Sequence, residues 1–193
     1  MTQQEIITIL KDCEAFLEGH FLLSSGLHSG GYCQCAKLLR YPDKAAKVLC
    51  EIVAQVRDLG ITKVCGPAMG GVIVSYELAR QLGVESIFTE RKDGVMQLRR
   101  GFSVGEGDRI LISEDVVTTG KSTMETVDAL TAMGASVIGV ACIADRTKGE
   151  SALSLPIYSA VKLDFPTYEP DACPLCKQGL VLVKPGSRAE LKG

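Results

Sequence analysis

Residues 110–123, Ile-Leu-Ile-Ser-Glu-Asp-Val-Val-Thr-Thr-Gly-Lys-Ser-Thr, decide the fold class that this sequence predicts. An apolar run ends at Ile112, and two adjacent acids, Glu114 and Asp115, follow it. A loop rich in small hydroxyl side chains then leads into a helical pattern that starts at Met124. Backbone N–H groups at a helix start bind phosphate, and paired carboxylates suit a sugar diol or a magnesium ion. The stretch therefore predicts a strand, a sugar-phosphate site and a helix.

Two commoner phosphate-binding motifs do not fit this region. Gly120-Lys121-Ser122 ends like a P-loop, but Asp115 occupies the place of the first glycine, where its carboxylate would repel a triphosphate. Gly105 and Gly107 imitate the start of a dinucleotide-binding fingerprint. However, Ile110 replaces the third glycine, and the segment precedes a strand instead of following one. We therefore exclude both nucleotide-binding classes.

Short apolar strands alternate with helical patterns along most of the chain. We expect strands at 63–65, 86–89, 109–113 and 136–143, and helices at 72–82 and 122–133. Pro42 opens a further helix that ends before Gly60, and a capping box at Thr2–Glu5 starts a helix whose apolar positions continue to Leu17. This alternation predicts an α/β domain with a mainly parallel central sheet flanked by helices.

Composition and charge limit the class of protein further. The chain has 193 residues, 46% of them hydrophobic and 23% charged, which is typical of one soluble globular domain. Its net charge of −2 favours neither nucleic acid nor an anionic membrane as a partner, and no apolar stretch approaches the about 20 residues of a membrane span. The polar start resembles no secretion signal. Because several of the eight cysteines lie in apolar runs, we expect a cytoplasmic protein with reduced thiols.

Four segments follow predicted strands, and such segments meet at the carboxyl edge of a parallel sheet. Besides 114–123, they are the glycine-rich loop 66–71, the basic loop 91–100 and the pair Asp145-Arg146. The glycine-rich loop is either a plain turn or a pyrophosphate site built from backbone amides. The basic loop is either a solvated hairpin or a lid that brings cations to a leaving group. Arg146 either forms a structural ion pair or offers its fork to a carboxylate or imide.

The segment Cys173-Pro174-Leu175-Cys176 has the spacing of two metal ligands, but a zinc site needs four. Cys33 and Cys35 form the other close pair, and their spacing differs. His20 and His28, the only histidines, are expected to be hydrogen-bonded loop residues. We therefore predict a structural turn at Cys173–Cys176 and no essential metal site there.

Taken together, these segments resemble the orotate phosphoribosyltransferases, pentosyltransferases that join orotate to 5-phosphoribosyl-1-diphosphate (PRPP). Glu114–Ser122 resembles the PRPP signature of the type I phosphoribosyltransferases, and Gly19–Ser29 is similar to the family's N-terminal hood segment. Arg91-Lys92 resembles the family's lid, and Asp145-Arg146 resembles the segment with its orotate-contacting arginine. The resemblance covers most of the chain.

The resemblance implies a type I phosphoribosyltransferase fold in a single domain, residues 1–193, with a hood at 1–40. The density of prolines separately predicts an irregular tail or a short strand pair at 166–193. The resemblance also implies Lys92 and Asp115 as catalytic residues, and Thr118 and Arg146 as orotate contacts. The implied pyrophosphate loop comprises Ala68, Met69, Gly70 and Gly71. The implied PRPP contacts are Arg91, Lys92, Glu114, Asp115, Val116, Val117, Thr118, Thr119, Gly120, Lys121 and Ser122. Mg²⁺, bound mainly through PRPP and water, is the implied cofactor, and a homodimer is the implied assembly.

The sequence departs from many family members at two places. The lid lacks a further lysine and a histidine, so we expect Arg99 or Arg100 to substitute, and Ser24 stands where a hood lysine is common. A purine phosphoribosyltransferase and a PRPP-sensing regulator of gene expression are the alternative functions. The hood segment and Arg146 favour orotate over a purine, and no basic face or extra DNA-binding domain supports a regulator.

Overall fold

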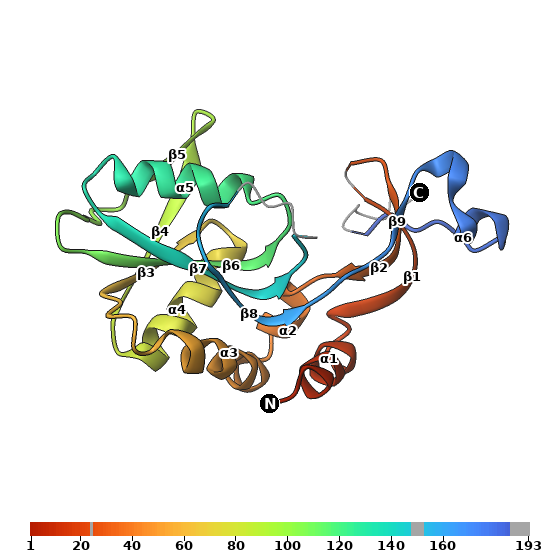
Figure 1. Cartoon of the computed structure of the whole chain (residues 1–193), viewed down its shortest axis with the longest axis horizontal. Helices are drawn as coiled ribbons and strands as arrows, with labels where there is room; N and C mark the ends of the chain where they lie inside the picture. Colours follow the sequence, from red (N-terminus) through yellow and green to blue (C-terminus); the bar gives the residue numbers. More distant parts are fainter. Residues whose placement is uncertain (24, 148–152, 186–193) are drawn as a thin grey trace, which may run out of the picture.

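The computed structural model describes residues 1–23, 25–147 and 153–185, and it contains one large and one small β-sheet (Figure 1). The large sheet has six strands in the order β5-β4-β3-β6-β7-β8. These are β3 (Lys63–Pro67), β4 (Glu85–Lys92), β5 (Val95–Leu98), β6 (Arg109–Val117), β7 (Ser136–Asp145) and β8 (Ile157–Lys162). All neighbours pair in parallel except β5, which is antiparallel to β4. The predicted mainly parallel α/β sheet is therefore confirmed.

Helices cover both faces of the large sheet. They are α1 (Gln3–Asp12), α2 (Ala36–Leu39), α3 (Pro42–Val56), α4 (Gly70–Leu82) and α5 (Lys121–Thr131). In Figure 1, α3 and α4 lie below the sheet and α5 lies above it. Adjacent residues of a strand point to opposite faces, so Leu111 packs with α3 and α4, whereas Ile110 and Ile112 pack on the α5 side. The apolar run that opens the deciding stretch is thus buried on both faces.

The small sheet combines the two ends of the chain. Its strands are β1 (Phe16–Leu22), β2 (His28–Cys33) and β9 (Thr167–Tyr168), with β2 in the centre and both pairings antiparallel. A short 3-10 helix, η1 (Pro170–Ala172), and α6 (Pro174–Lys177) follow β9. The chain then returns along β1, where Val183 exchanges two backbone hydrogen bonds of 2.8 Å with Leu22 and His20. Figure 1 shows this unit beside the end of the large sheet toward which β6 and β7 point.

The first helix is shorter than its apolar pattern predicts. It ends at Asp12, and Leu17 belongs to β1. Glu14 takes a left-handed conformation with φ of 54°, and the Ala15 N–H donates to the Leu10 carbonyl at 2.7 Å, which closes the last turn. The helical spacing of apolar residues therefore continues past the end of α1 into β1, and the predicted helix was too long.

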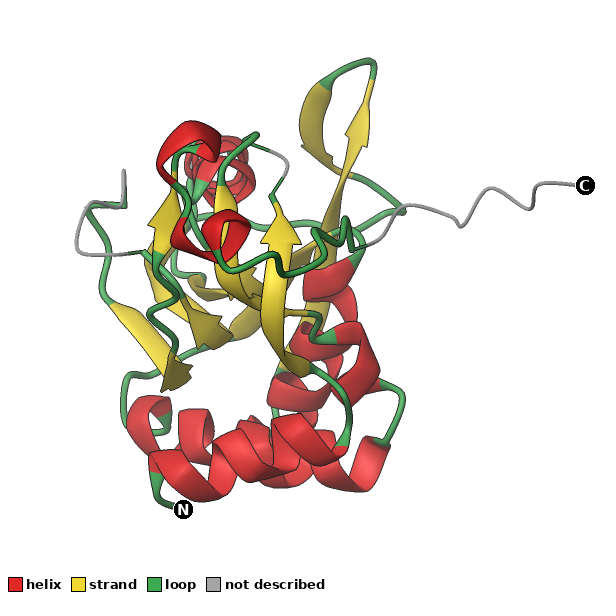
Figure 2. Ribbon diagram, turned by 90° about the vertical axis from the view of Figure 1, so that its right-hand side faces the viewer, coloured by secondary structure: helices red, strands yellow, loops and turns green. Residues whose placement is uncertain are grey.

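The predicted position of the two acids after their strand is wrong. β6 continues to Val117 because β7 extends beside it to Asp145, so Glu114 and Asp115 are themselves strand residues. The edge strand β8 was not predicted. The alternative of a loop or a hairpin at 91–101 resolves to a hairpin, β4–β5, which projects beyond the sheet in Figure 2. Within the described ranges, no helix has the length and apolar character to cross a membrane.

Candidate active site

The loop between β6 and α5 encloses a pocket of about 280 Å³. Arg91, Glu114 and all residues from 116 to 123 line it. Gly120, at the N-cap of α5, has φ of 74°, and a Cβ there would lie 2.7 Å from the Leu153 side chain. A glycine is therefore required for the turn that aims the first N–H groups of α5 into the pocket. Apart from Lys92 and Asp115, every residue implied as a PRPP contact lines this one pocket.

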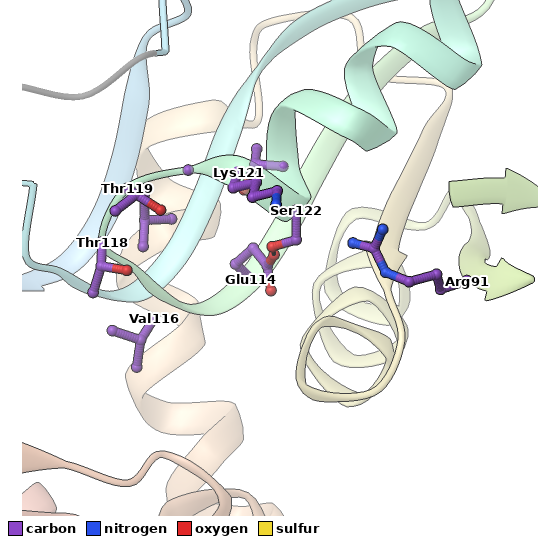
Figure 3. Close-up of a pocket in the computed structure, with 10 residues that line it drawn as sticks. Arg91, Glu114, Val116, Thr118, Thr119, Lys121 and Ser122 are labelled. Atoms are coloured by element: carbon purple, nitrogen blue, oxygen red, sulfur yellow. Dashed lines mark hydrogen bonds between the residues drawn. The ribbon is translucent and has the colours of Figure 1, made fainter. Parts of the chain in front are cut away.

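Glu114 lines this pocket, which we call the cradle. Its Oε1 accepts a hydrogen bond of 2.8 Å from the Ser122 hydroxyl, and the two side chains meet in Figure 3. Glu114 is buried, and burial raises the pKa of its carboxyl from 4.5 to about 7, with the nearby charge of Asp115 adding to the effect. A carboxylate held at this cost is stabilised by any cation or hydroxyl donor that enters the pocket.

Asp115 lies on the opposite side of β6 from Glu114, facing the loop between β3 and α4. A Cβ on Gly70 would lie 2.8 Å from the Asp115 carboxyl, so the backbone of this loop lies directly against the acid. Burial raises the pKa of Asp115, while its Oδ1 accepts a hydrogen bond of 2.8 Å from the Val116 N–H. The Ala68–Met69 peptide of the loop is cis, and both residues are exposed. The glycine-rich loop therefore lies against Asp115, on the side of β6 opposite to Glu114.

The β4–β5 hairpin brings one cation to the cradle. Arg91 pairs with Glu125 of α5 and donates to the Gly94 carbonyl at 2.8 Å, and its guanidinium lies toward the Ser122 side of the pocket (Figure 3). Lys92 is exposed and, as the next residue of the strand, faces the other way. Arg99 and Arg100 both bind Glu90 at 3.0 Å, at the base of the hairpin. Neither Lys92 nor these two arginines line the cradle of their own chain.

Arg146 lies in a second pocket, of about 580 Å³, at the end of β7. Its guanidinium stacks over the Phe165 ring at 4.8 Å, and burial lowers the pKa of the group. Its Nε is buried without a hydrogen-bond partner among the described residues, and no ion pair to Arg146 occurs among them either. The neighbouring Asp145 carboxylate instead accepts from the Thr147 N–H at 3.0 Å. This arrangement favours a ligand role for Arg146 over a structural ion pair.

The two pockets are adjacent because their strands are paired. Val117 at the end of β6 lies opposite Asp145 at the end of β7, and the Arg146 N–H donates to the Val117 carbonyl at 2.9 Å. The cradle and the guanidinium therefore open at the same edge of the sheet, as the positions after predicted strands had indicated.

Comparison with known proteins identifies the family. The phosphoribosyl transferase domain matches residues 39–168. Over 188 residues the chain is 48% identical to the orotate phosphoribosyltransferase of Caldicellulosiruptor saccharolyticus (strain ATCC 43494 / DSM 8903 / Tp8T 6331). The aligned region covers 97% of this chain and 98% of that relative. The chain belongs to the orotate phosphoribosyltransferase family. The solved orotate phosphoribosyltransferase of Aeropyrum pernix has a TM-score of 0.70 and 26% identity, covering 82% of this chain and 93% of that one. An adenine phosphoribosyltransferase of Thermoanaerobacter pseudethanolicus shares the fold, with a TM-score of 0.60, 16% identity and coverages of 69% and 88%.

Membership of the orotate phosphoribosyltransferase family confirms the resemblance drawn from the signature Glu114–Ser122 and the segment Gly19–Ser29. Ser24, expected where a hood lysine is common, lies outside the described residues. Sequence reasoning missed the segment 162–167, which follows β8 and lines the Arg146 pocket with Phe165 stacked on the guanidinium. Ile157, Tyr158 and Val161, residue types that are frequent in strands, were a signal that could have revealed this strand.

Proposed function

We propose that this chain transfers the 5-phosphoribosyl group of PRPP to orotate, yielding orotidine 5′-monophosphate and pyrophosphate, a step in the synthesis of UMP. The observation that carries this proposal is the junction of two pockets, a phosphate-binding loop between β6 and α5 and a half-buried Arg146 whose Nε has no hydrogen-bond partner among the described residues. The first suits a sugar phosphate and the second suits the carboxylate or imide edge of orotate. The family match supports the same reaction.

The geometry suggests a role for each part of the site. The loop Thr118–Ser122 would hold the 5′-phosphate through hydroxyls and the N–H groups of α5. Glu114 and Asp115 would accept hydrogen bonds from the ribose hydroxyls, and the loop Ala68–Gly71 beside Asp115 would hold the pyrophosphate. Arg146 would orient orotate, with Thr118 at the boundary between the two pockets. This order places the anomeric carbon between the base and the leaving group.

The reaction breaks the bond from the anomeric carbon to pyrophosphate and forms one to a ring nitrogen of orotate. The carbon develops oxocarbenium character, so catalysis requires stabilisation of the leaving group and close positioning of the base. Lid cations such as Lys92 and Arg91 would supply the first, and Arg146 the second. Orotate is an anion with an acidic ring, so no strong general base is required. Neither pocket is lined by a histidine.

We further propose Mg²⁺ as the cofactor. Magnesium prefers oxygen ligands and keeps several of its waters, and two poorly solvated carboxylates at Glu114 and Asp115 fit such a hydrated ion. When bound with PRPP, the ion would neutralise charge on the pyrophosphate. The two carboxylates would bind its waters and the ribose hydroxyls, while direct ligands would come mainly from PRPP.

A substrate panel tests the proposed base. The purified protein, with PRPP and Mg²⁺, should consume orotate and should not consume adenine, guanine or hypoxanthine. Turnover of a purine in preference to orotate would establish the purine phosphoribosyltransferase alternative. PRPP binding without turnover of any base would instead favour the regulatory alternative.

Glu114 should give PRPP binding a distinctive pH dependence. Because the pKa of Glu114 is about 7, its carboxyl gains a proton as the pH falls through that value and loses its attraction for magnesium and for hydroxyl donors. Glu114→Gln imitates the protonated form at every pH. The ratio of PRPP affinities between the wild type and Glu114→Gln, measured by calorimetry with Mg²⁺, should therefore approach one well below pH 7 and rise as the pH passes 7. A ratio that is constant with pH would contradict this role.

The stability of the free protein provides the control for this assignment. The folded pKa of Glu114 lies above its usual 4.5, so the folded state loses stability as the pH rises from 4.5 to 7, and the cost is constant above 7. Glu114→Gln should remove this cost. The variant should consequently unfold at a higher denaturant concentration than the wild type above pH 7, and the difference should disappear below pH 4.5.

We propose a homodimer in which the lid of one subunit serves the site of the other. Met69, Ile73 and Tyr76 form an exposed apolar stripe at and along the start of α4, 84%, 53% and 68% exposed, which suits a contact with a second copy. The β4–β5 hairpin projects beyond the sheet (Figure 2). Its Lys92 is not among the residues that line the cradle of its own chain. A lid that reaches a neighbour would account for both observations.

Mixed dimers test the shared site. Lys92→Ala and Asp115→Asn should each be nearly inactive, and random re-association of equal amounts should restore roughly a quarter of the sites, because half of the dimers are mixed and one of their two sites is intact. Each variant taken alone through the same dissociation and re-association is the control. Failure of the mixture to exceed both controls, with mixed dimers verified by mass spectrometry, would show that the lid serves its own subunit.

We place the reaction in the cytoplasm. All eight cysteines of the chain are free thiols in the structure, which suits a reducing compartment.

A further inference from the structure

Four side chains of metal-binding types meet at the small sheet, and none of them lines either pocket of the proposed active site. His20 comes from β1, His28 from β2, Cys173 precedes α6 and Cys176 lies within it. One ligand atom of each residue lies within 4.8 Å of the other three. We propose that these four side chains bind a structural Zn²⁺ ion that joins the C-terminal segment to the N-terminal hairpin.

The distances within this cluster match a tetrahedral site. The Cys173 Sγ lies 3.5 Å from His20 Nε2, and the Cys176 Sγ lies 3.7 Å from the same nitrogen and 3.4 Å from His28 Nδ1. Zinc with bonds of about 2.3 Å to sulfur and about 2.0 Å to nitrogen separates these atoms by about 3.5 Å and separates two nitrogens by about 3.3 Å. The two histidine nitrogens are 2.9 Å apart, about 0.4 Å closer than zinc would hold them, and all four ligand atoms lie within 4.8 Å of one another.

The surroundings of His20 orient it as a ligand. Its Nδ1 lies 2.9 Å from the Leu180 carbonyl oxygen, which accepts a hydrogen bond only from a protonated nitrogen. In the neutral ring, this bond leaves the lone pair of Nε2 directed at the cluster. A carbonyl that fixes the tautomer and direction of a histidine is the usual partner of a metal-bound imidazole. Both histidines and Cys173 are buried, so the cluster is protected from water on most sides.

The C-terminal segment needs such a link because it has almost no core. Among residues 169–185, only Cys173 is buried, at 1% exposure, although four consecutive apolar residues, Leu180 to Val183, are present and exposed. Two backbone hydrogen bonds to β1 are a weak anchor for a chain of this length. Segments that cannot bury apolar surface are commonly held by a metal or a disulfide. A Cys173–Cys176 disulfide would close a loop within the segment and would not attach it to the hairpin.

The chemistry of the donors selects zinc. Two thiolates and two imidazoles in a tetrahedron are typical of zinc, whereas magnesium and calcium prefer oxygen ligands. Sequence spacing predicted a plain turn at Cys173–Cys176 because it showed two ligands where zinc needs four. The structure supplies the missing two from residues about 150 positions earlier, with separations of 153 between Cys173 and His20 and 148 between Cys176 and His28. The two histidines are hydrogen-bonded as expected, but they lie in the strands β1 and β2 and not in loops.

The ion would also hold the sheet edge next to Arg146. His28 lies opposite Tyr168 in the β2–β9 pairing, and the next pair is Ser29 with Thr167, which lines the Arg146 pocket. Fixing His28 to the segment after β9 would therefore also fix the position of Thr167 in the lining of the Arg146 pocket.

Metal content tests the site directly. The wild-type protein, purified without chelators from medium containing zinc, should carry about one zinc per chain by elemental analysis. Cys176→Ser removes one ligand and should reduce the content to well under one. Cys50→Ser, an exposed free cysteine on α3 outside the cluster, is the matched control and should retain the full content. Loss of zinc from both variants, or from neither, would overturn the assignment.

A second measurement does not depend on the folding of a variant. In the folded wild type, two thiols should be protected from an alkylating reagent, and they should become reactive when one zinc is removed. Mass mapping should place these two thiols at Cys173 and Cys176. Cobalt added to the demetallated protein should then give the visible absorption of a tetrahedral thiolate site. Wild type that is folded and free of zinc, with both thiols reactive, would overturn the proposal, as would iron in place of zinc or a Cys173–Cys176 disulfide.

Discussion

Asp115→Asn is expected to lower kcat/KM by about 10²- to 10³-fold with orotate, the scale of one lost preorganised charge at a reacting centre. The substitution keeps the size of the side chain and removes its charge beside the backbone of Gly70. In the proposed mechanism, that charge orders the ribose hydroxyls and the hydrated magnesium. Steady-state kinetics with PRPP and magnesium varied separately measure the effect, which should appear as weaker use of both.

The stability of Asp115→Asn shows whether this loss is local. Burial raises the pKa of Asp115, which means that its charge costs stability in the folded protein. At neutral pH the variant should therefore unfold at an equal or higher temperature than the wild type. Wild-type kcat/KM in a folded Asp115→Asn protein would remove Asp115 from the site, and a lower unfolding temperature would indicate a structural role.

Arg146→Ala is expected to weaken the apparent affinity for orotate by about 10- to 100-fold, equivalent to about 1.5–3 kcal/mol for one charge-assisted contact. The affinity for PRPP, measured by calorimetry without orotate, should be nearly unchanged, because the phosphate cradle lies in the other pocket. A loss of orotate affinity without a loss of PRPP affinity is the decisive result. It distinguishes a base contact from a general loss of the site.

Arg146→Lys is the matched variant for this prediction. Lysine restores the charge without the two-pronged guanidinium, so it should recover part of the orotate affinity and leave PRPP binding unaffected. The stacking of Arg146 on Phe165 makes a stability control necessary. Loss of PRPP binding or unfolding in Arg146→Ala would make the arginine a phosphate ligand or a structural residue, and orotate recognition would then need another cation.

Local patterns in the chain were sufficient to predict the main elements of the large sheet. Pro42 begins α3, and Gly83 ends α4 with φ of 71°, because the conformations of proline and glycine are set by their own covalent structure. The signature at 114–122 predicted the phosphate cradle for the same reason. Its glycine, hydroxyls and helix start are contiguous, so their geometry depends little on the rest of the chain.

Pairing between distant segments decided what these patterns left open. Whether Glu114 and Asp115 lie within a strand depends on the length of β7 beside them, and no property of 110–123 contains that length. The exit of the chain from α1 into β1 likewise depends on the pairing of β1 with β2. The spacing of apolar residues in one segment does not show where a neighbouring strand begins or ends.

By itself, the sequence determined the α/β alternation, the turn from β6 into α5 and the resemblance to the orotate phosphoribosyltransferases, since each of these rests on residues close together in the chain. Only the tertiary structure decided that Arg146 is half-buried with no ion pair to any described residue, and that Lys92 does not line the cradle of its own chain. It alone joined His20 and His28 to Cys173 and Cys176. The physical reason is that the two ends of the chain meet in one small sheet, and the free energy that brings them together comes from contacts between residues about 140 to 150 positions apart.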